Sequence, residues 1–172
     1  MQGMVVEQVE DQLANRAGKY LSIELGQEQF GVPVSRIREI IGYQEVCGVP
    51  YTAAYVKGVI NLRGKVIPIV DLRSKFGMVE KEYSQRTCII VVEIRRRAAS
   101  MLMGVIVDGV SEVVNLSAAD LEPAPDFGDG RAMPFLAGMA KLKERVVILL
   151  DIDEALNGSD ASGLGSLLSG AA

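Results

Sequence analysis

The 172-residue chain has no histidine, no tryptophan and only two cysteines. Without histidine it lacks the commonest general base, the commonest metal ligand and the usual partner of a nucleophilic serine or cysteine. It also has no CxxC pair, no G-x-x-x-x-G-K-[ST] phosphate loop and no G-x-G-x-x-G dinucleotide motif. The acidic residues are scattered and lie mostly where turns and helix ends favour them. We therefore expect a protein that is not an enzyme and that holds neither a cofactor nor a metal.

Positive charge and long apolar runs are scarce as well. Lysine and arginine number 18 against 22 acidic residues, and the net charge of −4 disfavours general nucleic-acid binding, because phosphate neutralisation needs a basic surface. The apolar runs are much shorter than the roughly 20 residues of a membrane span, and the polar N-terminus does not have the layout of a signal peptide. Cys47 and Cys88 lie in apolar runs, which predicts reduced, buried thiols. These features predict a cytoplasmic protein without direct membrane insertion.

The most strongly patterned stretch is residues 56–72, V-K-G-V-I-N-L-R-G-K-V-I-P-I-V-D-L. Two Val/Ile-rich runs flank Arg63-Gly64, which predicts a β-hairpin with a two-residue turn, since glycine tolerates the positive φ of such turns. The nearly unbroken apolar runs imply burial on both faces. Pro68 cannot donate to a ladder and indicates an edge or a bulge. Arg63 is then a charge at the tip of a buried hairpin, which makes it the first functional candidate.

Other segments are typical of short strands and short helices. Strands are predicted at residues 19–25, 29–34, 87–94, 101–107, 110–114, 135–142 and 145–150, with an extended segment at 43–49. The spacing of Ile37, Ile40 and Ile41 predicts a short helix after Ser35.

Two aspartates and an arginine run stand at the ends of these segments. Asp71 and Asp151 precede short helical patterns, and we interpret both as helix caps. Residues 95–97, all arginine, lie at a predicted hairpin turn. They are a candidate anion patch, although solvated charge is the commoner role of such a run.

An internal duplication organises the whole chain. Residues 56–72 recur in outline as L-A-G-M-A-K-L-K-E-R-V-V-I-L-L-D-I at 136–152, and residues 30–41 match residues 103–114. We predict a flexible arm (1–18), a domain (19–157) and a flexible tail (158–172). The domain would hold two tandem five-stranded antiparallel barrels, at about 19–77 and 87–157, which can exchange elements. Each barrel alone is small, so the two should pack together around a groove.

The stretch K-G-V-I-N-L-R-G-K-V-I-P-I-V-D-L-R at residues 57–73 resembles the signature of the CheW family, the coupling proteins of bacterial chemotaxis. Supporting stretches are Y-L-S-I-E-L, V-S-R-I-R-E-I-I-G-Y, V-D-G-V-S-E-V and D-L-E-P-A-P. The resemblance implies a mainly β fold of two SH3-like barrels. It also implies an adaptor that joins the regulatory domain of a chemotaxis histidine kinase to the cytoplasmic tip of methyl-accepting receptors, in arrays at the inner face of the membrane.

Candidate contact residues follow from the same motifs. The resemblance places a receptor-binding groove at Ile37, Glu39, Gly58, Arg63 and Val113. A receptor tip is a helical hairpin, so apolar groups would receive its apolar face while charges fix its register. Kinase contacts are expected at an exposed apolar edge formed by Tyr43, Val46 and Val49.

Three other kinds of protein share some of these features. A CheW-like adaptor of another chemosensory-type pathway, such as twitching motility, stays open. A piece of the kinase, or a CheW–receiver fusion, is disfavoured because no histidine is present to be phosphorylated and few residues follow Asn157. A barrel that binds single-stranded nucleic acid is disfavoured by the 5% aromatic content and the negative charge.

Overall fold

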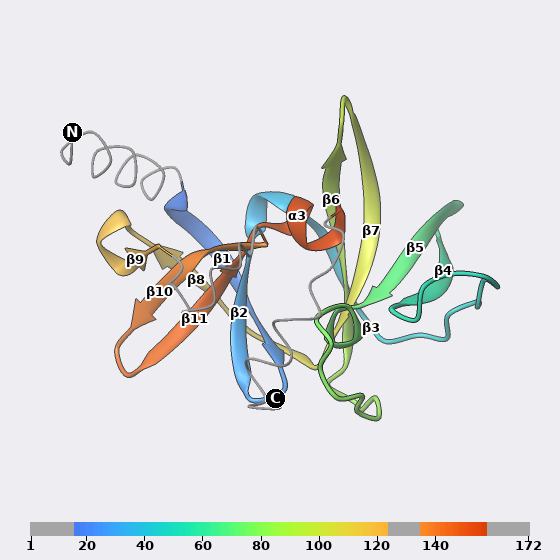
Figure 1. Cartoon of the computed structure of the whole chain (residues 1–172), viewed down its shortest axis with the longest axis horizontal. Helices are drawn as coiled ribbons and strands as arrows, with labels where there is room; N and C mark the ends of the chain where they lie inside the picture. The colour runs from blue at the N-terminus through green and yellow to red at the C-terminus, as the bar shows by residue number, and fades with distance from the viewer. Residues whose placement is uncertain (1–15, 124–134, 158–172) are drawn as a thin grey trace.

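The computed structural model describes residues 16–123 and 135–157, which form two β-sheets packed against each other (Figure 1). The first copy of the duplication contains β1 (Gly18–Leu25), β2 (Glu28–Pro33), β3 (Ile37–Gly42), β4 (Val56–Leu62) and β5 (Lys65–Asp71). The second contains β6 (Cys88–Arg96), β7 (Ala99–Val107), β8 (Gly109–Leu116), β9 (Leu121–Glu122), β10 (Leu136–Leu142) and β11 (Arg145–Leu150). Four short helices join them: η1 (Val34–Arg36), α2 (Leu72–Lys75), η2 (Ala118–Asp120) and α3 (Ile152–Asn157). The predicted tail and residues 1–15 of the predicted arm lie outside the described residues.

Each sheet combines strands of both copies. The strand order is β8-β1-β2-β11-β10-β9 in the six-stranded sheet and β3-β6-β7-β5-β4 in the five-stranded sheet. The order β8-β1-β2-β11-β10 becomes β3-β6-β7-β5-β4 when each strand is replaced by its counterpart in the other copy. In both sheets, the first hairpin of one copy therefore lies between strands of the other copy. A parallel pair, β2 with β11 and β5 with β7, joins the hairpin to its host in each sheet. The mainly β fold of two barrels from an internal duplication is confirmed. It differs from the prediction in that one sheet has six strands instead of five and each sheet contains one parallel pair, because the copies exchange their first hairpins.

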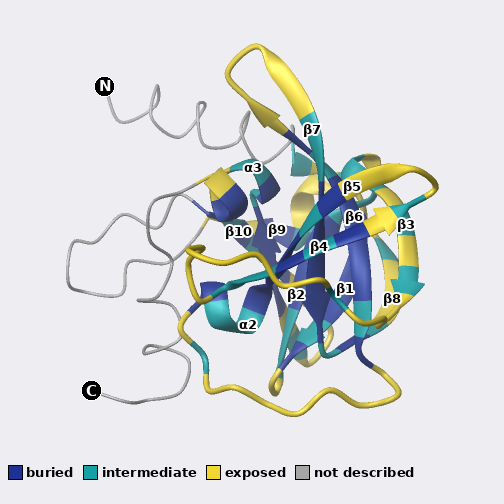
Figure 2. Ribbon diagram, turned by 90° about the vertical axis from the view of Figure 1, so that its right-hand side faces the viewer, coloured by how far each residue is buried: buried dark blue, intermediate teal, exposed yellow. Residues whose placement is uncertain are grey.

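Within residues 16–123 and 135–157, the buried apolar side chains form three hydrophobic clusters. A central cluster lies between the exchanged hairpins and includes Phe30, Phe76 and Ile90. A smaller cluster fills each barrel, around Val147 in one and around Ile67 and Ile89 in the other. Neighbouring residues of β6 therefore enter different clusters, which accounts for the burial of this strand on both faces (Figure 2). Because the central cluster draws on both copies, the two barrels are held together by a shared core.

The β4–β5 hairpin has the predicted two-residue turn. Arg63 and Gly64 have φ of 50° and 85°, and the Gly64 N–H donates to the Asn61 side chain over 2.9 Å. Positive φ at both positions matches the twist of the flanking strands. Pro68 pairs with Val59 and lies just before β5 begins to pair with β7, so its missing N–H removes no bond from that parallel ladder.

The predicted helix after Ser35 is wrong. A single turn, η1, occupies residues 34–36, and the chain then forms β3, which pairs antiparallel with β6. Ile37 and Ile41 lie on the half-buried side of β3, whereas Ile40 lies on the exposed side. The isoleucine spacing thus arises from two faces of a strand, and the ladder with β6 overrides the local helical pattern.

Both predicted aspartate caps are confirmed. The Asp71 carboxylate accepts hydrogen bonds from the backbone N–H groups of Arg73 and Ser74, and that of Asp151 accepts one from the Glu154 N–H at 3.2 Å. These bonds satisfy N–H groups that have no partner within the first turn. Each cap therefore fixes the point at which a strand gives way to a helix.

A third aspartate, Asp153, ties three elements together. It binds the Arg36 guanidinium through both oxygens, at 2.8 and 2.6 Å, and accepts the backbone N–H of Arg95 at 2.7 Å. Burial alone would raise the pKa of Asp153, but the hydrogen bonds from Arg36 and Arg95 outweigh it and hold the pKa below its ordinary value. The carboxylate thus anchors α3 to η1 and β6.

Candidate functional site

Each barrel opens into a cleft at its mouth. The larger one, the Arg63 cleft, has a volume of about 1070 Å³ and lies over the five-stranded sheet beside the β4–β5 turn. Its lining residues are Arg38, Glu39, Leu62, Arg63, Lys65, Val66, Ile67, Pro68, Val91, Glu93, Ser100, Met101 and Leu102. Apolar side chains continuous with the barrel cluster form most of the floor, and charged side chains stand among them.

An ion pair crosses the mouth of this cleft. Glu39 is on β3 and Arg63 is at the β4–β5 turn, and the two side chains form a salt bridge. Because β3 and β4 are the two edge strands of the sheet, the bridge joins edges that share no ladder. The Arg63 side chain is 75% exposed and that of Glu39 26% exposed. Such an exposed pair adds little stability. Because the Arg63 side chain is mostly exposed, most of its N–H donors face solvent.

A second ion pair and several apolar groups complete the rim. Arg38 of β3 binds Glu93 of β6 next to the first pair. Val66, at the start of β5, is 70% exposed and lies between the turn and the floor. An apolar floor with paired charges at its edge can receive the apolar face of a helix and orient it.

The other barrel has a similar arrangement, in which the basic residue comes from a different position of the hairpin. The Arg145 cleft, of about 620 Å³, includes Glu112 of β8 and Arg145 beside the β10–β11 turn, which form a salt bridge. The exposed valine Val146 corresponds to Val66 of the first cleft. Sequence analysis missed this second pair. The alignment of the two copies matches Glu39 with Glu112, but it matches Arg63 with Lys143 and Lys65 with Arg145, so it indicated only the acidic member of the pair.

The five residues predicted to contact a receptor do not lie in one cleft. Glu39 and Arg63 share the Arg63 cleft, whereas Ile37 is half-buried against the central cluster. Val113 lies on the edge strand β8 of the other sheet, where it is 56% exposed beside Glu112. Gly58 is buried, and an added Cβ would stand 1.9 Å from the carbonyl oxygen of Cys47. The close backbone approach alone requires glycine at that position.

The residues predicted to contact a kinase lie on the segment between β3 and β4. Tyr43 and Val49 are 38% and 41% exposed, and Val46 is half-buried against the cluster of the five-stranded sheet. The fully exposed Tyr51, with φ of 62°, follows on the same segment. Sequence patterning gave no sign of Tyr51, because its exposure depends on the path of the loop.

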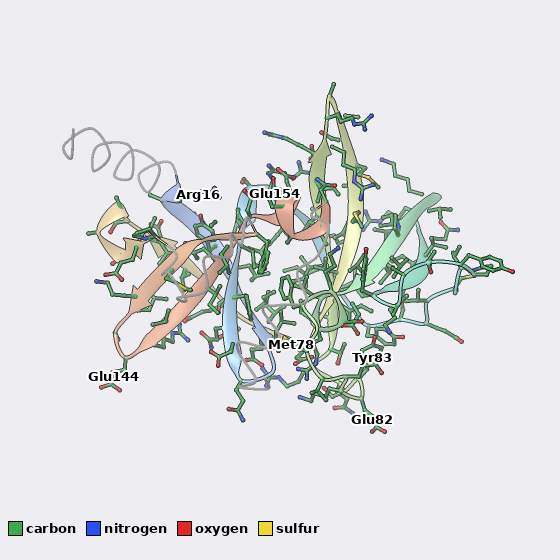
Figure 3. All side chains as sticks on the ribbon, viewed as in Figure 1. Arg16, Met78, Glu82, Tyr83, Glu144 and Glu154 are labelled. Carbon is green, nitrogen blue, oxygen red and sulfur yellow. The ribbon has the colours of Figure 1, made fainter. Side chains whose placement is uncertain are left out.

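A tyrosine pair anchors the start of this segment. The ring centroids of Tyr43 and Tyr83 are 4.5 Å apart. The Tyr83 hydroxyl donates a hydrogen bond to the Asp71 carboxylate over 2.7 Å (Figure 3, where Tyr83 is labelled). Burial, together with the hydrogen bond to Asp71, raises the pKa of Tyr83. The phenol therefore stays protonated and holds the connector between α2 and β6 against β3.

The two thiols differ in exposure. Cys88 is half-buried, but Cys47 is exposed, so the prediction that both are buried is wrong. Cys47 lies on the segment after β3 and meets the rest of the fold through backbone hydrogen bonds with Val59, at 3.0 and 2.9 Å. The segment pairs only with the edge strand β4 at this point, and the Cys47 side chain is exposed to solvent.

Within residues 16–123 and 135–157, no group of three or more histidine, cysteine, aspartate or glutamate side chains is placed to hold a metal ion. In that part of the chain, no helix has the length and apolar character needed to cross a membrane.

The duplicated sheets with a cleft at each mouth define a double-barrel protein of the SH3-like kind. The chain belongs to the CheW-like domain family, whose model matches residues 19–160. It is 38% identical over 142 residues to the chemotaxis protein CheW of Klebsiella aerogenes, covering 83% of each chain. It is 34% identical over 141 residues to the CheW of Rhizobium meliloti, covering 82% of this chain and 88% of that one. The crystal structure of the scaffolding protein TtCheW from Thermoanaerobacter tengcongensis superposes with a TM-score of 0.73 at 29% identity, over 83% of this chain and 94% of that one.

Proposed function

We propose that this protein is a non-enzymatic chemotaxis adaptor that couples a CheA-type histidine kinase, through its regulatory domain, to methyl-accepting receptors. Membership of the CheW-like family supports the adaptor role, as does the similarity to proteins named chemotaxis protein CheW and scaffolding protein. The protein would act in the cytoplasm, recruited to receptor arrays at the inner face of the membrane. The observation that carries the proposal is the Glu39–Arg63 ion pair across the mouth of an apolar cleft.

The receptor would dock as a helical hairpin at the Arg63 cleft and along the edge strand β3. Its apolar face would cover Val66 and the cleft floor, while Glu39 and Arg63 fix its register. Ile37 would support this surface from beneath, and Val113 would offer a separate apolar contact on the other sheet. Gly58 would act by allowing the loop after β3 to approach β4.

The kinase would use the segment between β3 and β4. Tyr43 and Val49 offer exposed apolar area, and Val46 fixes the segment to the barrel cluster. Aromatic side chains are frequent anchors at protein interfaces because they bury a large area at a low entropic cost. Separate surfaces for the two partners would allow a ternary complex.

The decisive experiment replaces Arg63 by alanine in the full chain and measures capture of receptor and kinase fragments. Lys143→Ala is the matched control, because Lys143 occupies the equivalent turn with φ of 52°. We expect Arg63→Ala to weaken receptor capture about fivefold, as for the loss of one rim charge, and to leave folding and kinase capture intact. Lys143→Ala should leave receptor capture unchanged.

Two outcomes would contradict the proposal. If wild-type protein captured neither fragment, the adaptor function would be wrong. If Arg63→Ala and Lys143→Ala captured receptor equally well, Arg63 would not be part of the interface.

A further inference from the structure

The hairpin of β6 and β7 projects beyond the rest of the molecule and ends in three consecutive arginines (Figure 1). Arg95, Arg96 and Arg97 are all exposed, and Arg97 turns the chain with φ of 53°. Figure 2 shows the end of this hairpin in the colour of exposed residues. The chain as a whole carries a net charge of −4. This tip, residues 95–97, is a local concentration of positive charge on an acidic protein, and we call it the arginine tip.

The arginine tip is held in place by α3. The Arg96 side chain donates to the Asn157 side chain, and the Asn157 amide donates to the carbonyl oxygen of Arg95 at 2.9 Å. Asp153 accepts the backbone N–H of Arg95. A tip fixed at its base loses less conformational entropy when it binds than a free loop does.

Neighbouring carboxylates are bound to other arginines. Asp153 binds the Arg36 guanidinium, and Glu93 binds that of Arg38. Among the described residues, no carboxylate forms a salt bridge with the guanidinium of Arg95, Arg96 or Arg97. Five donors per guanidinium, in a planar fork, match carboxylate oxygens, so the arginine tip has unused capacity for an anionic partner.

The arginine tip is continuous with the Arg63 cleft. In the regular β6–β7 ladder Glu93 pairs with Leu102 and Arg95 pairs with Ser100. Glu93, Ser100 and Leu102 all line the cleft. Because side chains alternate along a strand, Arg95 lies on the same face of β6 as Glu93. The apolar floor therefore leads along the hairpin to the basic end.

We propose that the arginine tip binds an acidic stretch of the same protein segment whose apolar side chains lie in the Arg63 cleft. This proposal rests on the proposed adaptor function and adds a chemical requirement: the docked helix carries carboxylates at the end that meets β6 and β7. The basic area is small and the chain is acidic overall. A few carboxylates therefore complement the arginine tip better than the extended negative charge of duplex DNA or of a membrane does. Either of these larger partners would also lie against acidic parts of this protein and be repelled by them.

The test measures binding of two fluorescent amphipathic helical peptides to the full chain at low salt. The peptides share one leucine face, and one carries glutamates at its end where the other carries glutamines. The variant is Arg95→Gln/Arg97→Gln, which spares Arg96 because its side chain binds Asn157. The control is Lys19→Gln/Lys81→Gln, which removes the same charge from two exposed lysines away from the cleft.

We expect wild-type protein and the lysine control to bind the glutamate peptide about fivefold more tightly than the glutamine peptide. This preference should vanish in the arginine variant and in high salt, while affinity for the glutamine peptide stays constant. Equal binding of both peptides by wild-type protein, or an unchanged preference in the arginine variant, would overturn the arginine proposal alone. Arginine-dependent binding of duplex DNA or phosphatidylglycerol vesicles, tighter than that of the peptide, would also overturn it. Failure of both peptides to bind would count against the cleft as a docking site and hence against its basis in the proposed function.

Discussion

Gly58→Ala separates a structural role from a contact role at a position within the signature motif. Gly58 is buried in β4 with φ of 141°, and an added Cβ would lie 1.9 Å from the carbonyl oxygen and 2.6 Å from the carbonyl carbon of Cys47. Cys47 cannot move aside freely, because its N–H and C=O both bond to Val59, at 3.0 and 2.9 Å. The substitution must therefore displace backbone or break these bonds.

The expected cost has two parts. Forcing an extra carbon into a packed site costs about 1–3 kcal/mol. A side chain held at positive φ adds about 1–2 kcal/mol. We expect Gly58→Ala to lower the free energy of unfolding by about 3 kcal/mol. For a chain of this size, that corresponds to a melting temperature lower by roughly 9 °C.

Thermal and urea unfolding of the full chain provide the assay, with Gly42→Ala as the control. Gly42 ends β3 and has no heavy atom within 4 Å of its added Cβ, so that variant should stay within about 0.5 kcal/mol of wild type. If Gly58→Ala matched the stability of Gly42→Ala, the steric reasoning would be refuted. If it kept its stability but lost receptor capture, Gly58 would be a contact residue.

Two further predictions concern charge and thiol chemistry. Asp153→Asn should cost about 1.5 kcal/mol at pH 7, because it removes a charged pair of bonds to Arg36. The folded pKa of Asp153 lies below its ordinary 3.8, so this contribution is present above about pH 3.8 and is lost as the pH falls through the folded pKa. In urea unfolding, the difference in the free energy of unfolding between wild type and Asp153→Asn should therefore be smaller at pH 3 than at pH 7. Cys47 should react with a thiol reagent faster than Cys88, and Cys47→Ser should remove the fast phase. A free-energy difference as large at pH 3 as at pH 7 would contradict the role of the Asp153 carboxylate. Equal reaction rates of Cys47 and Cys88 would contradict their difference in exposure.

Much of the candidate site was predictable from local chemistry, and its assembly was not. The sequence predicts Arg63 at a turn because Arg63-Gly64 separates two β-branched runs, and the structure has that turn. The isoleucine spacing around its partner Glu39 predicts a helix, whereas the structure has the strand β3 there. The same patterning predicts an extended segment at residues 110–114, the counterpart of residues 37–41 in the duplication, and this likeness is the signal for β3. The salt bridge between the two side chains depends on how the edge strands meet.

The sequence by itself determined the elements that short-range chemistry specifies. The β4–β5 turn follows from Gly64, which tolerates positive φ, and helix starts follow from the capping aspartates Asp71 and Asp151. The family follows from the order of duplicated motifs. Each of these depends on a few neighbouring residues. They are therefore visible in the chain before it folds.

Only the tertiary structure decided which copy each hairpin joins. Strands of the two copies have similar apolar patterns, so local patterning does not choose between pairing within a copy and pairing between copies. The structure pairs β1 and β2 with β8 and β11, and β6 and β7 with β3 and β5. This exchange buries a shared central cluster that neither copy forms alone. It also brings the arginine tip into line with the Arg63 cleft, because it places β6 and β7 in the sheet of β3, β4 and β5.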